Sequence, residues 1–242
     1  MSVPVFLVDA LPEGDRAVLA GPEGHHAATV QRLRVGEAVA ISDGRGTTAT
    51  ATIVGVGRST LELTIDERRY DERPSPRLVV AQAIAKGDRG ELAVQAMTEV
   101  GVDEIVPWAA SRSVALWRGE RGERAWRRWQ VTAREAAKQS RRSWLPVVSA
   151  AAGTTEVAER LRAAAAGFVL HETAEDRLSV ADLPEEGEIV LVVGPEGGVA
   201  PAELAAFTDA GARPVRLGRT VLRTSTAGVA ALSVLSARLR RW

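Results

Sequence analysis

The pattern of apolar residues changes abruptly at residues 71–77, and this change constrains the fold more than any other feature of the sequence. Before it, short alternating or β-branched runs are separated by Gly, Asp and Pro. After it, apolar runs typical of buried strands alternate with stretches of helical periodicity. Residues 71–77 contain two prolines and four charged side chains, a composition typical of linkers. We therefore predict two domains in the 242 residues, covering 1–72 and 73–242.

The first domain has the pattern of a small all-β fold. Its apolar runs cover residues 3–8, 38–43, 47–56 and 59–65. Strands this short and this closely spaced predict a small barrel or a sandwich.

The second domain is predicted to be α/β. The expected strands are 78–85, 104–108, a segment near 145–149, 167–172, 188–194 and 214–218. The expected helices are 91–101, about 119–140, 154 to about 166, 201–211 and 226–242, the first of them preceded by a possible capping box at 88–91. Repeated strand–helix units predict a mostly parallel sheet with helices on both faces.

Composition excludes several classes of protein. The chain has no cysteine and only three histidines, which argues against a disulfide framework, thiol catalysis and a zinc, iron–sulfur or other metal site. Its start has no positively charged leader, and Asp9 soon interrupts the apolar stretch. No window approaches the roughly 20 apolar residues that cross a bilayer. We therefore expect a cytoplasmic protein with no membrane partner.

The net charge is zero, with 31 basic and 31 acidic residues, which argues against nucleic-acid binding through overall basicity. The charge is unevenly distributed, however. Residues 112–142 have a net charge of +7, 143–212 of −9 and 213–242 of +7. Of the 31 basic residues 29 are arginine, whose guanidinium matches phosphate in a bidentate manner. This pattern favours recognition of an anionic partner through two local arginine-rich segments.

Three strand ends in the second domain have unusual sequences: 170–172, 194–198 and 217–224. Open α/β sheets bind ligands beyond the carboxyl ends of their strands, so these loops are the candidate ligand site. Gly194, Gly197 and Gly198 allow a close approach that a Cβ would block, and Pro201 suits the first turn of the next helix. The chain lacks a P-loop, a G-x-G-x-x-G fingerprint and a G-x-S-x-G elbow, which argues against those nucleotide and hydrolase sites.

Motifs along nearly the whole chain resemble those of the ribosomal RNA small subunit methyltransferase E family, which are uridine-N3 methyltransferases of the SPOUT superfamily. The resemblance rests on His25-His26, LRVGE (33–37), TEVGV (98–102), RSV (112–114), EAAKQS (135–140) with Arg142, GPEGG (194–198), LG (217–218), VLRT (221–224) and TA (226–227). Each piece alone is unspecific, but their order and spacing together are highly specific.

The resemblance implies a PUA-like β-barrel followed by a SPOUT-type α/β domain with a deep C-terminal trefoil knot. It implies a homodimer that binds S-adenosylmethionine in the knot and methylates N3 of one uridine in 16S rRNA of the small ribosomal subunit. The cofactor-binding residues expected from it are Leu170, His171, Glu172, Gly194, Pro195, Glu196, Gly197, Gly198, Leu217, Gly218, Val221, Leu222 and Thr224.

Arg223 is the candidate catalytic residue. As N3 loses its proton, negative charge spreads onto the two uracil carbonyl oxygens, and a guanidinium suits that charge. The alternatives are a phosphate contact or a salt bridge at the start of a helix. No general base can be named, although Glu172 and Glu196 lie in the right loops.

The RNA-binding candidates are His25, His26, Arg32, Arg34, Arg112, Arg141 and Arg142. Trp117, Trp126 and Trp129 could stack on bases, but we expect them to pack on the core or on a dimer partner. The spacing of Leu232, Leu235 and Leu239 predicts that the last helix packs on its own sheet and on a second subunit.

The chain departs from the commoner family pattern at two positions. Ser225 stands where many relatives have Glu, and Ala96 where many have Lys. The first change removes any role for a carboxylate at position 225, although Ser would still suit the N-cap of the last helix. Two other functions stay open: a knotted methyltransferase acting on a ribose 2′-hydroxyl, and an RNA-binding or assembly factor without catalysis.

Overall fold

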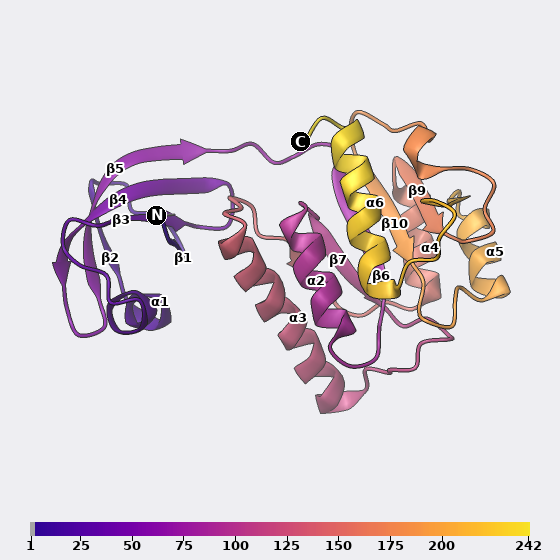
Figure 1. The fold of residues 1–242 in the computed structure, drawn as a ribbon, viewed down its shortest axis with the longest axis horizontal. Helices are drawn as coiled ribbons and strands as arrows, with labels where there is room; N and C mark the ends of the chain where they lie inside the picture. The colour runs from indigo at the N-terminus through magenta and orange to yellow at the C-terminus, as the bar shows by residue number, and fades with distance from the viewer. Residues whose placement is uncertain (1–2) are drawn as a thin grey trace. The chain divides into compact units, whose positions relative to one another are not determined.

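The computed structural model describes residues 3–242, so the first two residues of the predicted first domain lie outside it. Within this range the chain forms two compact units (Figure 1). One consists of the residues up to Arg73 together with Ala137–Leu145, and the other of Pro74–Ala136 and Pro146–Trp242. Residues 137–145 join the first unit although they lie far from it in sequence. The domain limits of 1–72 and 73–242 therefore stay a prediction.

The first unit is built on a five-stranded sheet. Its strands are β1 (Val5–Leu7), β2 (Arg16–Leu19), β3 (Ala38–Ser42), β4 (Thr47–Val56) and β5 (Leu61–Tyr70), in the spatial order β1-β3-β4-β5-β2. All pairings are antiparallel except that of β1 with β3. Alternate residues of β4 and β5, such as Ile53, Leu61 and Leu63, are buried in one core. This is the all-β fold that the first seventy residues predict.

Three elements of this unit were not predicted from the sequence. Strand β2 has one fully buried residue, Leu19, so it lacks a clear alternation. Helix α1 (Gly21–His25) and the π-helical turn η1 (His26–Val30) follow it. The sequence of α1 contains two glycines and a proline, which have the lowest helix propensities. Gly24 is nevertheless needed there, because a Cβ would lie 2.5 Å from the carbonyl oxygen of Leu19.

The second unit contains a six-stranded sheet in which every pairing is parallel, as predicted. Its strands are β6 (Arg77–Ala83), β7 (Glu104–Trp108), β8 (Val147–Val148), β9 (Ala166–Leu170), β10 (Glu188–Val193) and β11 (Arg213–Val215). Their spatial order is β11-β9-β10-β6-β7-β8. The chain runs outward from β6 to β8 and then returns to build the other half beside β6. Neighbouring strands β6 and β10 thus mark the point where the order reverses.

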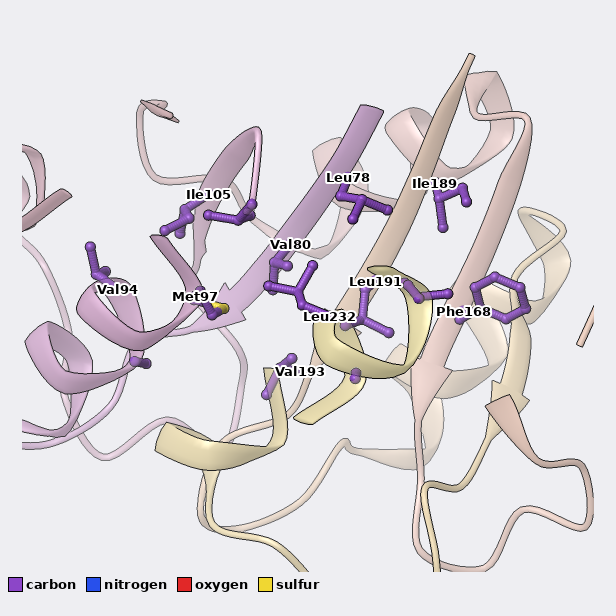
Figure 2. Close-up of a cluster of buried hydrophobic side chains, with 14 of the residues drawn as sticks. Leu78, Val80, Val94, Met97, Ile105, Phe168, Ile189, Leu191, Val193 and Leu232 are labelled. Atoms are coloured by element: carbon purple, nitrogen blue, oxygen red, sulfur yellow. The ribbon is translucent and has the colours of Figure 1, made fainter. Parts of the chain in front are cut away.

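Helices cover both faces of this sheet, and side chains alternate between two cores. One core contains Leu78, Val80, Ile189 and Leu191 together with side chains from α2 (Arg89–Glu99), α3 (Gly119–Gln139), η2 (Leu178–Val180) and α6 (Thr224–Arg238). Figure 2 shows the strand residues of this core with side chains from α2 and α6. The other contains the intervening residues, such as Val79 and Val190, with side chains from α4 (Thr154–Ala163) and α5 (Pro201–Asp209). Burial on both faces explains the unbroken apolar runs of β6 and β10.

The predicted packing of the tryptophans on the core is confirmed. Trp129 is 2% exposed, and its ring meets that of Trp117 edge to face at 4.9 Å between centroids. Trp126 donates from Nε1 to the carbonyl oxygen of Val148 at 3.1 Å. On α6, Leu232 and Leu235 are fully buried against the sheet, as their spacing predicts.

Several local predictions were wrong. Asp88 takes the N-cap position of α2 but makes no side-chain capping bond, because its backbone is already helical. Helix α4 ends at Ala163 rather than near 166, since β9 begins at Ala166. Ser225 is not the N-cap of α6: Arg223 takes that position, and Ser225 is buried in the first helical turn. By contrast, the predicted strand near 145–149 is confirmed, although it is short: β8 covers Val147–Val148.

The knot stays a prediction, because strand order and register alone do not determine whether the chain threads through a loop. Among residues 3–242 no helix combines the length and the apolarity needed to cross a bilayer.

Candidate active site

The three unusual strand ends line one cavity of about 590 Å³ in the second unit. It lies at the carboxyl ends of β9, β10 and β11, which are neighbours in the parallel sheet. Every predicted cofactor-binding residue and Arg223 lie on its wall. The complete lining is Arg89, Leu170, His171, Glu172, Val193, Gly194, Pro195, Glu196, Gly197, Gly198, Val199, Val215, Arg216, Leu217, Gly218, Thr220, Val221, Leu222, Arg223, Thr224 and Ala227. Sequence positions far apart are thus brought together as predicted.

The turn after β10 has a shape that depends on its glycines. The N–H of Gly198 donates to the carbonyl oxygen of Pro195 at 2.9 Å, which closes the turn. Gly198 has a φ of +73°, a conformation that residues with a Cβ rarely adopt. A Cβ on Gly194 would lie 2.9 Å from Cγ2 of Val199. This turn therefore presents bare backbone to the cavity.

Arg112 supports the same turn from behind. Its Nη1 donates to the carbonyl oxygen of Gly197 at 3.2 Å. A Cβ on Gly197 would lie 3.1 Å from Cβ of Arg112 and 3.2 Å from its carbonyl oxygen, so a side chain here would press on Arg112. Arg112 remains exposed, and the predicted RNA contact stays a prediction. The position of Arg112 also gives it a structural role that the sequence did not suggest.

The segment after β11 leads into α6 and forms a second wall of the cavity. The hydroxyl of Thr224, the first residue of α6, donates to the carbonyl oxygen of Gly194 at 2.8 Å and joins the two walls. Arg223 is the N-cap, and its carbonyl oxygen accepts from the N–H groups of Thr226 and Ala227. Its exposed side chain has no capping bond. Among residues 3–242 the guanidinium also forms no ion pair, so it makes no salt bridge at the start of the helix, and it lies on the cavity wall.

The end of β9 supplies the third wall. The N–H of His171 donates to the carbonyl oxygen of Val215 at 2.9 Å, which extends the pairing of β9 with β11 by one residue. The hydroxyl of Thr173 lies 2.9 Å from Nδ1 of His171, and the N–H of Thr173 lies 3.4 Å from it. Since a backbone N–H can only donate, Nδ1 acts as an acceptor and orients the imidazole.

A fourth element, which the sequence analysis missed, also contributes to the cavity. Arg89, at the start of α2, lies on the cavity wall, and its Nη1 is 3.5 Å from Oε1 of Glu196. It follows the carboxyl end of β6, which lies beside β10 in the sheet. The same rule that identified the other loops applies to this strand end too. The other lining residues that were not predicted are Val193, Val199, Val215, Arg216 and Ala227, while Thr220 belongs to the predicted loop 217–224.

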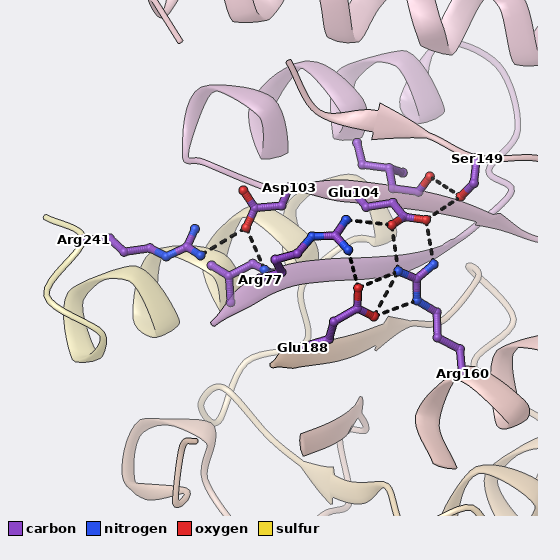
Figure 3. A network of polar contacts seen from close by, with 9 residues as sticks. Arg77, Asp103, Glu104, Ser149, Arg160, Glu188 and Arg241 are labelled. Atoms are coloured by element: carbon purple, nitrogen blue, oxygen red, sulfur yellow. Dashed lines mark hydrogen bonds and ion pairs between the residues drawn. The ribbon is translucent and has the colours of Figure 1, made fainter. Parts of the chain in front are cut away.

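The opposite end of the same sheet has a cluster of ion pairs (Figure 3). Arg160 of α4 donates to both carboxylate oxygens of Glu104 at 2.6 and 2.7 Å, and its Nη2 lies 3.1 Å from Glu188. Arg77 bonds to the same two glutamates, at 3.0 Å for Glu104. Ser149 donates to Glu104 at 3.1 Å.

The ion pairs determine how these groups titrate. Burial disfavours the ionised form of Glu104, but the hydrogen bond and charge of Arg160, with help from Ser149 and Arg77, outweigh it and lower its pKa below the ordinary value. Burial likewise opposes the charge on Arg160, but Glu104 and Glu188 raise its pKa. Both groups therefore stay charged in the folded protein at neutral pH.

The remaining RNA-binding candidates all belong to the first unit. His25 ends α1 and His26 begins η1; Nδ1 of His25 lies 3.4 Å from the hydroxyl of Ser59, and Nε2 of His26 lies 3.1 Å from Nε2 of Gln31. Arg32 and Arg141 have φ values of 56° and 55°. Arg34 and Arg142 are also placed in this unit. Their contact with RNA stays a prediction.

The cavity suits the implied S-adenosylmethionine in size and in chemistry. Sites for ligands of this size have volumes of about 300–1,000 Å³ and combine apolar walls with a few polar groups. Here apolar Leu170, Leu217 and Leu222 alternate with backbone from the Gly194 turn and with the charged groups of Glu172 and Arg223. A Cβ at Gly198 or Gly218 would enter open space. No group of three His, Asp or Glu side chains within residues 3–242 is arranged to hold a metal ion.

Comparison with protein families gives two matches. Residues 71–236 match the model of an RNA methyltransferase domain, and residues 19–66 that of an RNA methyltransferase PUA domain. The first match covers most of the second unit, and the second covers most of the five-stranded sheet.

Individual relatives match over nearly the whole chain. The ribosomal RNA small subunit methyltransferase E of Mycobacterium bovis is 46% identical over 98% of this chain and 93% of its own length. The protein of the same name from Bacillus subtilis is 28% identical over 90% of this chain and 88% of its own.

A solved structure of that name, from Neisseria gonorrhoeae and bound to S-adenosyl methionine, superimposes with a TM-score of 0.87 at 27% identity over 98% of both chains. A methyltransferase from Legionella pneumophila, in complex with the cofactor SAM, also gives 0.87, at 26% identity over 98% of both chains.

Proposed function

The chain belongs to the ribosomal RNA small subunit methyltransferase E family, and we propose that it transfers a methyl group from S-adenosylmethionine to N3 of one uridine in 16S rRNA. Without regard to the target nucleotide or atom, the chain is an S-adenosylmethionine-dependent RNA methyltransferase. The observation that supports this most directly is the convergence of three separate strand ends on one cavity of suitable size and lining. Two relatives with SAM bound share this fold over 98% of their length.

The proposed reaction forms a bond between N3 and the methyl carbon and breaks the bond between that carbon and the sulfonium sulfur. The bound donor supplies an activated methyl group, and the sulfur leaves as a neutral thioether. The N3 proton is lost to solvent or to a base. Because N3 lies on the pairing edge of uracil, the target must be unpaired or flipped out before it can react.

Arg223 is proposed as the catalytic residue in this reaction. Its side chain is exposed on the cavity wall and forms no ion pair among the described residues, so it is available to a substrate. A guanidinium beside the two carbonyl oxygens would stabilise the negative charge that develops as N3 is deprotonated. The backbone of the Gly194 turn and of residues 217–218 would hold the donor and align it for in-line transfer.

We propose that the RNA is held by His25, His26, Arg32, Arg34, Arg112, Arg141 and Arg142. Most of these lie in the unit that contains the match to the PUA model. The substrate in this proposal is 16S rRNA of the small ribosomal subunit, and the enzyme is a cytoplasmic homodimer. The exposed apolar side chains of Val221 and Leu222, 77% and 38% exposed, would suit either a second subunit or an RNA base.

The test is mass spectrometry that maps modified positions in 16S rRNA from a strain lacking the gene. One N3-methyluridine should disappear and return when the wild-type gene is restored, but not with Arg223→Ala. Loss of a ribose-methylated nucleotide instead would replace this proposal with the 2′-hydroxyl alternative. Unchanged rRNA, together with no binding of S-adenosylhomocysteine in calorimetry, would favour the non-catalytic factor.

A further inference from the structure

Gln82 is the one polar side chain among the interior residues of β6, and it is fully buried. It lies near the carboxyl end of that strand, behind the cavity, and does not line it. Neighbouring positions in the strand are Val80, Ala81 and Ala83, all buried and apolar. A polar group in such surroundings is unfavourable unless its hydrogen bonds are made.

The amide of Gln82 has one possible orientation. Its Nε2 lies 3.0 Å from Oγ1 of Thr224, 3.2 Å from the carbonyl oxygen of Ala83 and 3.3 Å from that of Thr224. Backbone carbonyls only accept, so the NH₂ group must face this side and the amide oxygen the other.

This orientation sets the direction of a short chain of hydrogen bonds. The hydroxyl of Thr224 donates to the carbonyl oxygen of Gly194 at 2.8 Å, so it must accept from Gln82. The chain runs from β6 through the first residue of α6 to the turn after β10. It therefore ties the two cavity walls formed by Gly194 and Thr224 to a central strand of the sheet.

The amide oxygen of Gln82 shows that this residue is not optimised for stability alone. Among the residues that the structure describes, Oε1 of Gln82 has no hydrogen-bond partner. It faces Gly228 of α6, where a Cβ would lie 2.6 Å from Sδ of Met97 and 3.4 Å from this oxygen. Met97 belongs to the apolar core beside α2 (Figure 2). An unpartnered buried oxygen is a cost that an apolar side chain of similar size would avoid.

We infer that Gln82 is a positioning residue, which holds Thr224 and the Gly194 turn in the spacing that the donor molecule requires. This inference rests on the proposed function, since it assigns the cavity to S-adenosylmethionine. Gln82 itself touches neither substrate. Its effect passes through the Thr224 hydroxyl, which it orients toward Gly194, and through the Thr224 carbonyl at the start of α6.

The test measures the affinity for S-adenosylhomocysteine by calorimetry in Gln82→Met, which keeps the length of the side chain and removes the donor. We expect roughly three- to tenfold weaker binding, the scale of one lost hydrogen bond. Val80→Ala, on the same strand and in the same core, is the matched control. It should lower the melting temperature and leave the affinity unchanged.

A second pair of variants tests the chain of hydrogen bonds itself. Thr226→Val removes a hydroxyl from the same turn of α6 but outside the cavity lining and should bind like the wild type. Thr224→Val removes the hydroxyl that Gln82 orients and should bind as weakly as Gln82→Met. In the double variant of Gln82→Met and Thr224→Val, the two losses should not add, because both break the same chain. A purely structural role would give additive losses in melting temperature without this pattern in affinity.

The outcomes separate this inference from the function on which it rests. If the wild type binds S-adenosylhomocysteine and Gln82→Met binds it equally well, the positioning role is wrong and the proposed function stands. If Gln82→Met does not fold, the decision passes to Thr224→Val. The inference is overturned if this variant binds S-adenosylhomocysteine as tightly as the wild type. If the wild type does not bind at all, the proposed function fails and the inference fails with it.

Discussion

The two ends of the parallel sheet in the second unit are built from opposite kinds of residue. At the amino ends, β6 and β10 begin with Arg77 and Glu188, which the register places side by side, and β7 begins with Glu104. Arg160 completes a cluster in which each carboxylate meets two guanidinium groups (Figure 3). At the carboxyl ends, β9, β10 and β11 lead into loops around an open cavity.

The difference lies in how the charges are used. The cluster at the amino ends satisfies its charges internally, at distances down to 2.6 Å, and is largely shielded from solvent. At the cavity, the pair between Arg89 and Glu196 is long, at 3.5 Å, and Arg223 forms no ion pair within residues 3–242. Charges paired inside the protein hold strands together, whereas charges left available can meet a ligand. We therefore expect substitutions at one end to change stability and at the other to change binding or turnover.

The largest expected effect is that of Glu104→Ala. It leaves Arg160 and Arg77 without one of their partners in a partly buried site, and such losses cost about 3–5 kcal/mol of unfolding free energy. Urea denaturation measures this loss. Glu159→Ala, an exposed glutamate on the same helix as Arg160, is the control and should cost less than about 0.5 kcal/mol.

Glu104→Ala also tests whether the two ends act separately. Under conditions where the variant is folded, its affinity for S-adenosylhomocysteine should equal that of the wild type. A weaker affinity would mean that the cluster shapes the cavity through the strands, and the division between the two ends would be wrong.

The next largest effect is expected at the other end, from Arg223→Ala. Removing one donor aimed at developing charge lowers turnover by roughly 10²- to 10³-fold, and we expect a loss of this order. The measurement is methyl transfer to small-subunit rRNA, with denaturation as a check that stability is unchanged. Arg219→Ala is the matched control, because Arg219 lies in the same exposed loop but not on the cavity wall. Equal losses in the two variants would point to a general electrostatic contribution to RNA binding instead.

Gly198→Ala should have a smaller effect, and it should lower both the stability of the protein and its affinity for S-adenosylhomocysteine. A Cβ at a φ of +73° costs roughly 1–2 kcal/mol of stability. Gly211→Ala has the same kind of cost, with a φ of +93°, but lies in the turn between α5 and β11. Both variants should lose similar stability, and only Gly198→Ala should weaken binding of S-adenosylhomocysteine. If both weaken it equally, the loss comes from the fold rather than from the turn.

Much of the site could be predicted from the sequence because its residues are local to strand ends. An apolar run followed by Gly-Pro-Glu-Gly-Gly indicates both the buried strand and the tight turn after it, and the rule for parallel sheets then places such turns together. The alternation of strands and helices predicted the sheet for the same reason. Arg89 was missed because it stands at the start of a helix rather than in an unusual loop.

The cluster at the amino ends could not be predicted in this way. Its members are far apart in sequence, since Arg77 and Glu188 are 111 positions apart, and only the pairing of β6 with β10 brings them together. Cap geometry was also beyond the sequence. Asp88 and Ser225 are suitable residues for an N-cap, but neither side chain caps its helix. Asp88 occupies the N-cap of α2 with a helical backbone and no side-chain capping bond, and Ser225 lies inside the first turn of α6. The membership of residues 137–145 in the first unit is likewise a matter of tertiary contact.

The smallest expected effect is the response of the amino-end cluster to acid. Burial opposes the charge on Glu104, but Arg160, Ser149 and Arg77 lower its pKa below the ordinary 4.5, so the unfolded chain takes up this proton more readily than the folded one. The carboxylate therefore contributes stability that is fully present above about pH 4.5 and is lost as the pH falls toward its lower folded pKa. Glu104→Gln removes this titration. Its unfolding free energy should be below that of the wild type at pH 7, and the gap should narrow in acid.

The measurement is urea denaturation of the wild type and Glu104→Gln from pH 7 down to about pH 3. Parallel curves would mean that Glu104 does not take up its proton differently in the folded and unfolded states, contrary to the pairing with Arg160. The affinity for S-adenosylhomocysteine at pH 7 should be the same in both proteins. If it differs, charge at the amino ends reaches the cavity, and the two ends of the sheet are coupled rather than separate.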